Sequence, residues 1–393
     1  MKSRILCFGD YYLPGFKFGG PIRSIANLIE NLGDEFDFLV VTRDRDFQEE
    51  LPYSGISSNK WNSVGKAKVF YISPEKLGLL GVTKLLNETN YDILYLNSFF
   101  SPVMTIAPLV AQRLGLVKKK PTLLAPRGEF SPGALGLKRF KKRLFIKIFN
   151  KLGLWHSVTW QATSARELAD IRSVFGRQTE DIRIAPNLTV GEVKISSSRD
   201  AIGWMERPRR LSPIKLVFLS RISRKKNLIF LLQVLKKVNR KLELSIYGPL
   251  EDDSYWEECK VIIEALPSCI LVNYYGETSP KKVSEVFSEH DLFVFPTLGE
   301  NFGHVIHESL SAGTPVLLSD QTPWVPSQSR AVQILPLNCI SLWILRIREW
   351  IDLSNSQLNE SRLSSFAYIK AYNKDDDGIE ASRRVFSYLG SKF

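Results

Sequence analysis

The sequence contains few of the residues that build metal centres and disulfide frameworks. Its 393 residues include only four cysteines and four histidines. No two cysteines have the Cys-x-x-Cys spacing, which favours buried thiols in a reducing compartment over a disulfide framework or a metal site. The cysteines are Cys7, Cys259, Cys269 and Cys339.

Long apolar runs are also absent. No stretch approaches the eighteen or so apolar residues of a membrane span, and the N-terminal sequence MKSRILCFGDYY becomes polar too early for a signal peptide. We therefore expect a soluble cytoplasmic protein. With 44% hydrophobic and 24% charged residues, the chain is globular and long enough for two domains. Its net charge of +12 favours phosphate-bearing partners, whether nucleotide, lipid surface or nucleic acid, without choosing among them.

Short apolar runs alternate with helix-compatible segments along most of the chain. This alternation predicts an α/β protein whose parallel strands are covered by helices. Residues 191–213 interrupt it with a run rich in Ser, Arg and Pro, typical of a linker between domains. Before the linker, strands are expected at 4–9, 37–42, 68–72, 93–97, 122–125, 157–162 and 182–185. After it, strands are expected at 214–219, 242–247, 270–273, 292–295, 316–318 and 331–334.

Other segments have clear helix or loop signals. Residues 55–66 are polar and rich in serine, which predicts a surface loop. Helices are expected at 21–32, 165–175 and 226–238, and through most of the C-terminal segment 355–393.

Two places in the first half have features of a ligand site. The pair Gly19 and Gly20 precedes Pro21, which suits the first turn of a helix, and a helix start favours an anion. A tight connection is the alternative. Arg127 and Glu129 follow the expected strand 122–125, at the edge where open α/β sheets bind ligands. For these two residues the alternative is a loop ion pair.

A basic amphipathic helix is predicted over residues 137–154. Phe140, Leu144 and Ile148 recur at helical spacing on one face, and lysines and arginines occupy most of the other. Such a helix could lie on an anionic membrane, at about 1 kcal/mol per basic residue. Alternatively, its apolar face packs on the domain core while its basic residues are solvated.

The stretch 291–326 reads as a strand, a loop, a helix and another strand, which together form a βαβ unit. Glu300 and Glu308 flank the start of the helix. Gly299 and Gly303 let backbone N–H groups approach a ligand there. The two carboxylates beside glycine-rich turns therefore predict a ligand site.

Arg221 and Lys226 stand directly after the first expected strand of the second half. Arginine offers a planar fork and lysine a mobile point charge, so the two can converge on a diphosphate. Cations for a diphosphate and the carboxylates of Glu300 and Glu308 for sugar hydroxyls describe a nucleotide-sugar site. Residues 274–277 are expected to face the base.

Several segments resemble a known family. LSRISRKKN, YGPLED and the run from YYGETSP to PVLLSD are similar to the C-terminal domain of family 4 of the retaining glycosyltransferases. FGGPIRSIANLIENL and LAPRGEFSPGAL in the first half resemble members that build bacterial surface polysaccharides. The resemblance implies the GT-B fold, two Rossmann-like doubly wound domains that face a cleft. Residues 1–190 with about 372–393 would form the acceptor-side domain, and 210–371 the donor-binding domain.

The resemblance also implies roles for the site residues. Arg221 and Lys226 would hold the donor diphosphate and neutralise the leaving group. Glu308 would bind the ribose, and Glu300 the transferred sugar. The residues whose amides would orient the sugar and its phosphate are Phe302, Gly303 and His304.

The implied activity is retaining, metal-independent transfer of a sugar from a nucleotide-diphosphate sugar to a glycan or lipid-linked glycan. Its product would be lipopolysaccharide, capsule or exopolysaccharide. No cofactor, metal or nucleic-acid partner is implied, and contact with the inner face of the membrane through the basic helix stays open. A small sugar-phosphate acceptor is an alternative, and a noncatalytic polyanion-binding protein is an alternative of a different class.

The chain departs from the family at two places. Arg127 stands where relatives often have the histidine of a Pro-His-Gly sequence, which puts in doubt the first-domain residue that contacts the sugar. Leu188 follows Pro186 and Asn187 where many relatives have glycine, so the bend between the domains is expected to differ.

Overall fold

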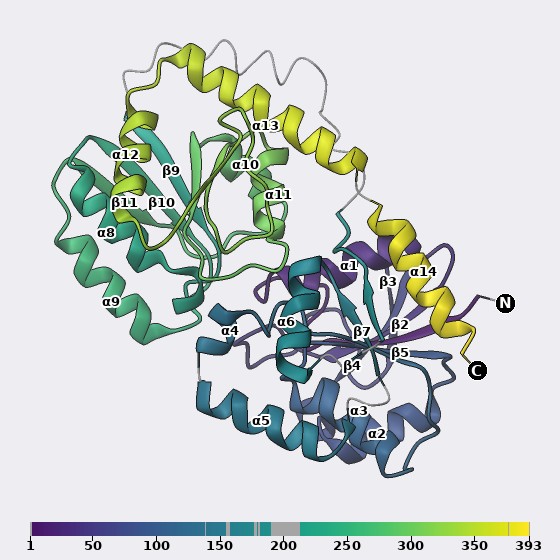
Figure 1. Ribbon diagram of the computed structural model, residues 1–393. Helices are drawn as coiled ribbons and strands as arrows, with labels where there is room; N and C mark the ends of the chain where they lie inside the picture. The colour runs from purple at the N-terminus through teal and green to yellow at the C-terminus, as the bar shows by residue number, and fades with distance from the viewer. Residues whose placement is uncertain are drawn as a thin grey trace. The chain divides into compact units, whose positions relative to one another are not determined.

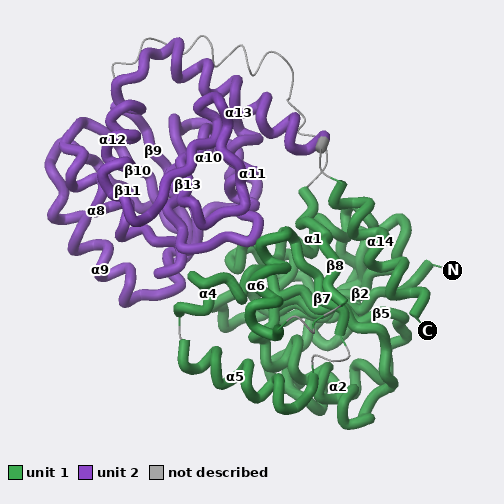
Figure 2. The backbone as a smooth tube through the Cα atoms, viewed as in Figure 1, with its two compact units in different colours: residues 1–190, 377–393 green, residues 191–376 purple. Residues whose placement is uncertain are grey.

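The computed structural model describes residues 2–137, 139–154, 158–176, 179, 181–189, 213–375 and 377–392. The chain divides into two compact units (Figure 2). Unit 1 comprises Met1–Val190 and Asp377–Phe393, and unit 2 comprises Gly191–Asp376. Each unit has its own sheet (Figure 1). Buried apolar residues form one core cluster in unit 2 and two in unit 1. The expected linker, apart from Pro213, lies outside the described residues.

Unit 1 is built on an eight-stranded sheet with the order β3-β4-β2-β1-β5-β6-β7-β8. Neighbouring strands pair in parallel except β3 and β4, which are antiparallel. The strands are β1 (Arg4–Phe8), β2 (Asp37–Arg43), β3 (Trp61–Val64), β4 (Ala67–Ile72), β5 (Ile93–Asn97), β6 (Thr122–Ala125), β7 (Val158–Ala162) and β8 (Ile182–Ile184). The order reverses direction between β1 and β5, as in a doubly wound sheet.

Helices cover both faces of this sheet. Ile5 and Cys7 of β1 belong to the core beneath α1 (Gly20–Leu32) and α14 (Gly378–Gly390). Leu6 and Phe8 belong to the core on the other face, because successive strand side chains alternate. The helices over that second core are α2 (Leu79–Glu88), α3 (Ala107–Arg113), α5 (Arg139–Lys151) and α6 (Ala165–Phe175).

The C-terminal helix α14 is part of unit 1 although it follows unit 2 in the chain. The ring of Phe386 lies 5.5 Å from that of Phe36, 6.0 Å from that of Phe38 and 5.6 Å from that of Tyr95. Aromatic clusters of this kind bury large apolar areas. The packing of Phe386 therefore fixes the end of the chain on the first sheet.

Unit 2 is built on a six-stranded parallel sheet with the order β11-β10-β9-β12-β13-β14. The strands are β9 (Ile214–Leu219), β10 (Leu242–Tyr247), β11 (Ile270–Tyr274), β12 (Leu292–Phe295), β13 (Val316–Ser319) and β14 (Val332–Leu335). The helices are α8 (Leu228–Val238), α9 (Asp253–Glu264), α10 (Val283–Ser288), α11 (His304–Ser311), α12 (Ile340–Ile351) and α13 (Asn355–Asp375). The fold class predicted from the sequence is confirmed, with two Rossmann-like sheets of mainly parallel strands.

Three local predictions are corrected by the structure. The segment 55–66, expected to be a loop, includes β3, whose Trp61 ring lies 5.4 Å from that of Phe70. The expected helix 137–154 is narrower: α5 begins at Arg139 and follows a short helix α4 (Pro132–Gly136). The expected helix 226–238 begins at Leu228, because Asn227 adopts a left-handed conformation with φ of 61°.

Candidate active site

The second sheet reverses its order between β9 and β12, and this switch point is where open α/β sheets bind ligands. The loop that leaves β9 carries Arg221 and Lys226. The loop that leaves β12 carries Glu300. Because the two strands are neighbours in a parallel sheet, their carboxyl ends lie at the same edge. Residues about eighty positions apart in the sequence are thus brought to one place.

Hydrogen bonds to backbone carbonyls connect these two loops. The amide of Leu298 donates to the carbonyl of Lys225 at 2.8 Å, and the hydroxyl of Thr297 donates to the same carbonyl at 3.2 Å. From the other side, Asn227 Nδ2 donates to the carbonyl of Pro296 at 3.0 Å. The left-handed turn at Asn227 therefore serves to fix the backbone around Lys226.

Lys226 and Glu300 form a nearly buried ion pair across the switch point. The Nζ atom of Lys226 donates to Oε1 of Glu300, and their side chains are only 13% and 11% exposed. Oε1 of Glu300 also accepts a hydrogen bond from Thr297 Oγ1 at 3.3 Å. The amide of Glu300 donates to the carbonyl of Gln321 at 2.9 Å, which anchors the loop. The sequence prediction brought these two charges to one site, and the structure places them in contact.

Burial and charge shift the pKa values of both groups. Burial lowers the pKa of Lys226, and the carboxylate of Glu300 opposes that shift only in part. Burial alone would raise the pKa of Glu300, but the charges of Lys226, Lys225 and Arg221 outweigh it and lower that pKa. Glu300 is therefore ionised at neutral pH. Because a buried ion pair contributes little net stability, this pair is better explained by a ligand than by folding.

Arg221 approaches the same site from a rigid loop. Its Nη1 atom lies 3.0 Å from Oε1 of Glu251, and its side chain is 22% exposed. Gly248 permits this arrangement, since its φ is +135° and an added Cβ would lie 1.8 Å from the carbonyl oxygen of Ser220. The amide of Ile222 donates to the carbonyl of Pro249 at 2.8 Å. These contacts fix the backbone from which the guanidinium extends.

The start of α11 presents backbone amides beside Glu300. Gly303 adopts φ of +77°, a conformation that costs glycine little, and the site of its missing Cβ lies 3.7 Å from Cγ of Glu300. The carbonyl of Phe302 accepts a hydrogen bond from Trp324 Nε1 at 2.6 Å. The Trp324 ring stacks on Tyr372 of α13 with centroids 4.8 Å apart. Trp324 thus fixes the backbone of the turn at Phe302. The dipole of α11 favours an anion at the start of the helix.

Two predicted donor-binding side chains belong to α11 itself. His304 is the first residue of the helix, and its ring lies 4.8 Å from that of buried Phe302. Glu308 lies one turn further along and is half-buried. Both therefore stand on the element that begins at the Gly303 turn.

Aromatic side chains end the strands on one side of the switch point. Tyr275 stacks on Tyr247 with ring centroids 4.9 Å apart and planes 14° apart. Tyr275 is 55% exposed, whereas Tyr274 is 36% exposed and is fixed by a hydrogen bond from its hydroxyl to the carbonyl of Gly248 at 2.9 Å. The face of Tyr275 is the one that a planar base could use.

Arg127 belongs to a hydrogen-bond network within unit 1. Its guanidinium donates to Oδ1 of Asn97 at 2.8 Å, to Oδ1 of Asn187 and to the hydroxyl of Tyr95. That hydroxyl in turn donates to Gln161 Oε1 at 2.7 Å. Arg127 thereby links β5, β7 and the segment that follows β8 to its own loop after β6. The role expected for it on the acceptor side stays a prediction.

Glu129 stabilises the loop that directly follows β5. Its carboxylate accepts hydrogen bonds from Ser98 Oγ at 2.7 Å and from the amides of Phe99 and Phe100. Burial raises the pKa of Glu129, and these hydrogen bonds oppose the rise. Glu129 and Arg127 thus have different partners. The alternative of an ion pair between these two residues is therefore wrong.

The remaining first-half prediction concerns the start of α1. Gly19 precedes the helix with φ of +74°, and Gly20 is its first residue. An added Cβ at Gly19 would meet no atom within 4 Å, so the turn is open to solvent or to a ligand within unit 1.

A polar cluster at the carboxyl edge of the first sheet was not predicted from the sequence. Oδ1 of Asp10 accepts hydrogen bonds from Ser101 Oγ at 3.0 Å and from Arg43 Nη2 at 3.3 Å. Among the residues that the structure describes, Nε of Arg43 is buried and has no hydrogen-bond partner. Asp10 and Arg43 each directly follow an expected strand, a signal that could have identified them.

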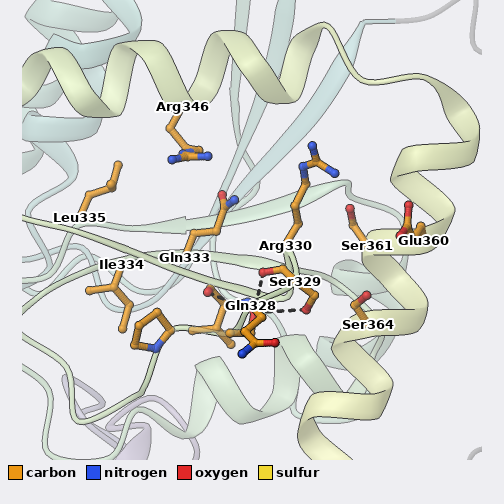
Figure 3. Close-up of a pocket in the computed structure, with 13 residues that line it drawn as sticks. Gln328, Ser329, Arg330, Gln333, Ile334, Leu335, Arg346, Glu360, Ser361 and Ser364 are labelled. Atoms are coloured by element: carbon orange, nitrogen blue, oxygen red, sulfur yellow. Dashed lines mark hydrogen bonds between the residues drawn. The ribbon is translucent and has the colours of Figure 1, made fainter.

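A pocket of about 550 Å³ lies elsewhere in unit 2, between β14, α12 and α13 (Figure 3). The Ser327 hydroxyl in this pocket stabilises the turn before β14. Its Oγ atom donates to the carbonyl of Ser329 at 2.7 Å and accepts from the amide of Val332 at 3.0 Å. Arg346 lines the pocket, and its Nη1 atom lies 2.7 Å from Oε2 of Glu349. None of the residues of the switch-point site lines this pocket.

The two sheets and the switch-point site define the class of the fold, which is GT-B. HepE (Alr3699) of Anabaena, solved in complex with UDP and glucose, is similar in structure with a TM-score of 0.68 and 16% identity, over 99% of this chain and 100% of that chain. Trehalose-6-phosphate synthase OtsA has a TM-score of 0.67 at 11% identity, over 100% of both chains. Sucrose-phosphate synthase of Thermosynechococcus elongatus has a TM-score of 0.67 at 15% identity, over 98% and 100%.

The sequence comparison is more specific for the second half. Residues 206–332 match the family Glycosyl transferases group 1, a range that contains Arg221, Lys226, Glu300 and Glu308. A comparison with curated protein sequences finds no match. Within the described residues, no helix is both long and apolar enough to cross a membrane. The family match and the GT-B fold together support a glycosyltransferase.

Proposed function

We propose that this protein is a retaining, metal-independent glycosyltransferase. It transfers a sugar from a nucleotide-diphosphate sugar to a glycan or lipid-linked glycan in the synthesis of a surface polysaccharide. The observation that carries the proposal is the nearly buried pair of Lys226 and Glu300 at the switch point of the second sheet, with Arg221 on the adjoining loop. Cations and a carboxylate at one site suit a diphosphate and a sugar.

Each group of the site has a role in the proposed transfer. Lys226 and Arg221 neutralise the diphosphate as it leaves, an interaction that strengthens in the transition state as charge develops on the phosphate. Glu300 accepts hydrogen bonds from the transferred sugar, and Glu308 from the ribose. Amides at the start of α11 orient the phosphate and sugar. The departing phosphate assists deprotonation of the acceptor on the same face, so no side chain is assigned as nucleophile.

Unit 1 would bind the acceptor. A small sugar phosphate is the second candidate for that acceptor, and Arg43 favours it, because its cationic side chain is 31% exposed at the carboxyl edge of the first sheet. Two structural neighbours are named as synthases of sugar phosphates, which is consistent with this alternative. A glycan acceptor would instead be neutral at this position.

A thermal-shift screen of nucleotide sugars tests the proposal. A ligand that binds only the folded protein raises its melting temperature, by an amount that grows with its concentration. We expect one class among UDP, GDP and ADP sugars to stabilise the protein, and the Lys226→Ala variant to lose most of that shift. Equal, small shifts with all three classes would argue against a donor site.

The lowered pKa of Lys226 predicts an alkaline limit for donor binding. As pH rises through that pKa, Lys226 loses the charge that holds the diphosphate, so affinity should fall before pH reaches the ordinary lysine pKa of 10.5. Folding stability changes in the opposite sense. Between the two pKa values the unfolded chain binds more protons than the folded one, so the Lys226 contribution to stability increases with pH.

Titrations of a nucleoside diphosphate at several pH values would measure the effect. Lys226→Arg keeps the cation at all of these pH values, so its affinity should stay nearly constant where that of the natural protein falls by up to about tenfold per pH unit. An identical alkaline decline in both proteins would assign the loss to another group.

A further inference from the structure

Helix α5 is attached to unit 1 by one side only. Phe149 is buried, and Phe145 and Ile146 pack against the core of the sheet. The ring of Phe99 lies 4.6 Å from that of Phe149 and 5.5 Å from that of Phe145. This inner side fixes the helix along the outside of the unit (Figure 1). It also differs from the apolar side that the sequence pattern had singled out.

The apolar side that the sequence pattern identified faces solvent. Phe140 is 81% exposed, and Leu144, Ile148 and Leu152 are each about half exposed. The alternative that this side packs on the domain core is therefore wrong. Spaced four residues apart, the four side chains form one apolar stripe along the helix and the residue after it. A continuous exposed stripe of this kind marks an interaction surface rather than scattered apolar residues.

A second stripe of basic residues runs beside the apolar one. It consists of Arg139, Arg143, Lys147 and Lys151, all of them exposed and again four residues apart. No Asp or Glu occurs between residues 139 and 152. Lys142 is the exception on this helix, because its Nζ atom donates to the carbonyl of Ala134 at 2.6 Å and lies over the Phe100 ring.

We propose that these two stripes, called here the α5 surface, dock unit 1 onto an anionic lipid bilayer. An amphipathic helix in the membrane interface buries apolar side chains among the acyl chains while its cations contact anionic headgroups. The α5 surface offers both features in parallel and carries no acidic residue that the headgroups would repel. A second copy of the chain would set one basic stripe against another. A nucleic acid would leave Phe140 and its neighbours in water.

The inference goes beyond the proposed transfer and does not depend on it. Docking uses α5 of unit 1, whereas the charged groups proposed to bind the donor belong to unit 2, and the Gly19 and Gly20 turn predicted to bind the donor is not part of the α5 surface. Vesicle binding can therefore be measured without donor or acceptor. Failure of one proposal leaves the other intact.

Flotation of the full chain with lipid vesicles tests the α5 surface. We expect binding to vesicles of phosphatidylcholine with phosphatidylglycerol at low salt, weak binding to phosphatidylcholine alone, and release as salt is raised. Arg143→Ala with Lys147→Ala should lower partitioning roughly 30-fold, from about 1 kcal/mol per basic residue. Leu144→Ser with Ile148→Ser should lower it at least about tenfold, because the apolar stripe no longer inserts.

Matched substitutions in unit 2 provide the controls. Lys236→Ala with Lys237→Ala removes two exposed cations from α8, and Val261→Ser removes an apolar side chain that is 67% exposed on α9. Both should bind vesicles as the natural chain does. Circular dichroism would verify that all variants are folded, which is expected because the altered side chains are exposed. Equal binding of all variants, or none by the natural chain, would overturn the proposal. The proposal would also be overturned if the natural chain formed a dimer and the Leu144→Ser with Ile148→Ser variant were a monomer.

Discussion

Replacing Lys226 or Glu300 by alanine is expected to reduce sugar transfer by about 10²- to 10³-fold, the usual loss when a preorganised charge at a transition state is removed. Lys226→Ala leaves the departing diphosphate without a nearly buried cation. Glu300→Ala removes the carboxylate that holds the sugar and also the partner that fixes Lys226. Initial rates with a nucleotide sugar and acceptor would measure both losses.

A control from the same turn separates this effect from general loss of charge. Arg224 stands two residues before Lys226, but it is exposed and pairs with Glu258 and Asp252. Arg224→Ala should change transfer by less than about twofold, since exposed pairs contribute little. Normal turnover in both Lys226→Ala and Glu300→Ala would refute the site assignment.

Stability has to be measured alongside, because removing one partner of a buried pair leaves an uncompensated charge. The double substitution Lys226→Met with Glu300→Gln removes both charges and should recover most of any stability lost by the single variants. Transfer should stay low in the double variant if the pair acts on the substrate. Recovery of both stability and activity would show that the pair is structural only.

Gly303→Ala is expected to raise the donor KM by about ten- to a hundredfold, because displacement of positioning groups by about 1 Å has effects of that size. At φ of +77° an alanine is strained, and its Cβ would lie 2.7 Å from Cδ1 of Ile306. Either the Ile306 side chain or the turn would have to shift, and the strain at this φ favours a shift of the turn, which would move the amides at the start of α11. Steady-state kinetics at varied donor concentration would measure the change.

Gly55 provides the matched control for that substitution. It has the same φ of +77°, lies in an exposed loop of unit 1, and an added Cβ there would meet nothing within 4 Å. Both substitutions should lower the free energy of unfolding by about 1–2 kcal/mol, the cost of a left-handed alanine, and Gly303→Ala should lower it further through its close contact with Ile306. Only Gly303→Ala should alter the donor KM. Equal kinetic effects at the two positions would remove the α11 turn from the proposed site.

Much of the fold could be predicted because the central strands are continuous apolar runs. β12 is buried along its whole length, and β9 is apolar except at the exposed Lys215, so both strands appear in the sequence as hydrophobic segments. β3 could not be found this way, because it is an edge strand whose WNSV sequence has no buried residue and no apolar run. Asn227 delays α8 by two residues through a backbone conformation that periodicity does not report.

The orientation of α5 shows a different limit. Its sequence contains two apolar faces, one with Phe140 and Leu144 and another with Phe145 and Phe149. Helical periodicity recognises both and cannot state which one meets the core. The choice depends on the aromatic cluster around Phe99, which comes from another part of the chain.

The candidate site was predicted in part, because it follows strand ends that the sequence reveals. The pairing of Lys226 with Glu300 depends on strand order, since β9 and β12 are neighbours only in the folded sheet. The network around Arg127 was not predicted, because it joins residues from β5 to the segment after β8. The same holds for Trp324, whose role in bracing the Gly303 turn comes from a hydrogen bond to a carbonyl.

Calorimetric titration of the full chain with nucleoside diphosphates tests the central claim most directly. We predict saturable binding of one nucleoside diphosphate per chain, weakened at least about tenfold in Lys226→Ala, because a charge-assisted contact is worth about 1.5–3 kcal/mol. The Arg224→Ala protein should bind as the natural one does. Binding to polyanions alone, with no saturable site for any nucleoside diphosphate, would contradict the account.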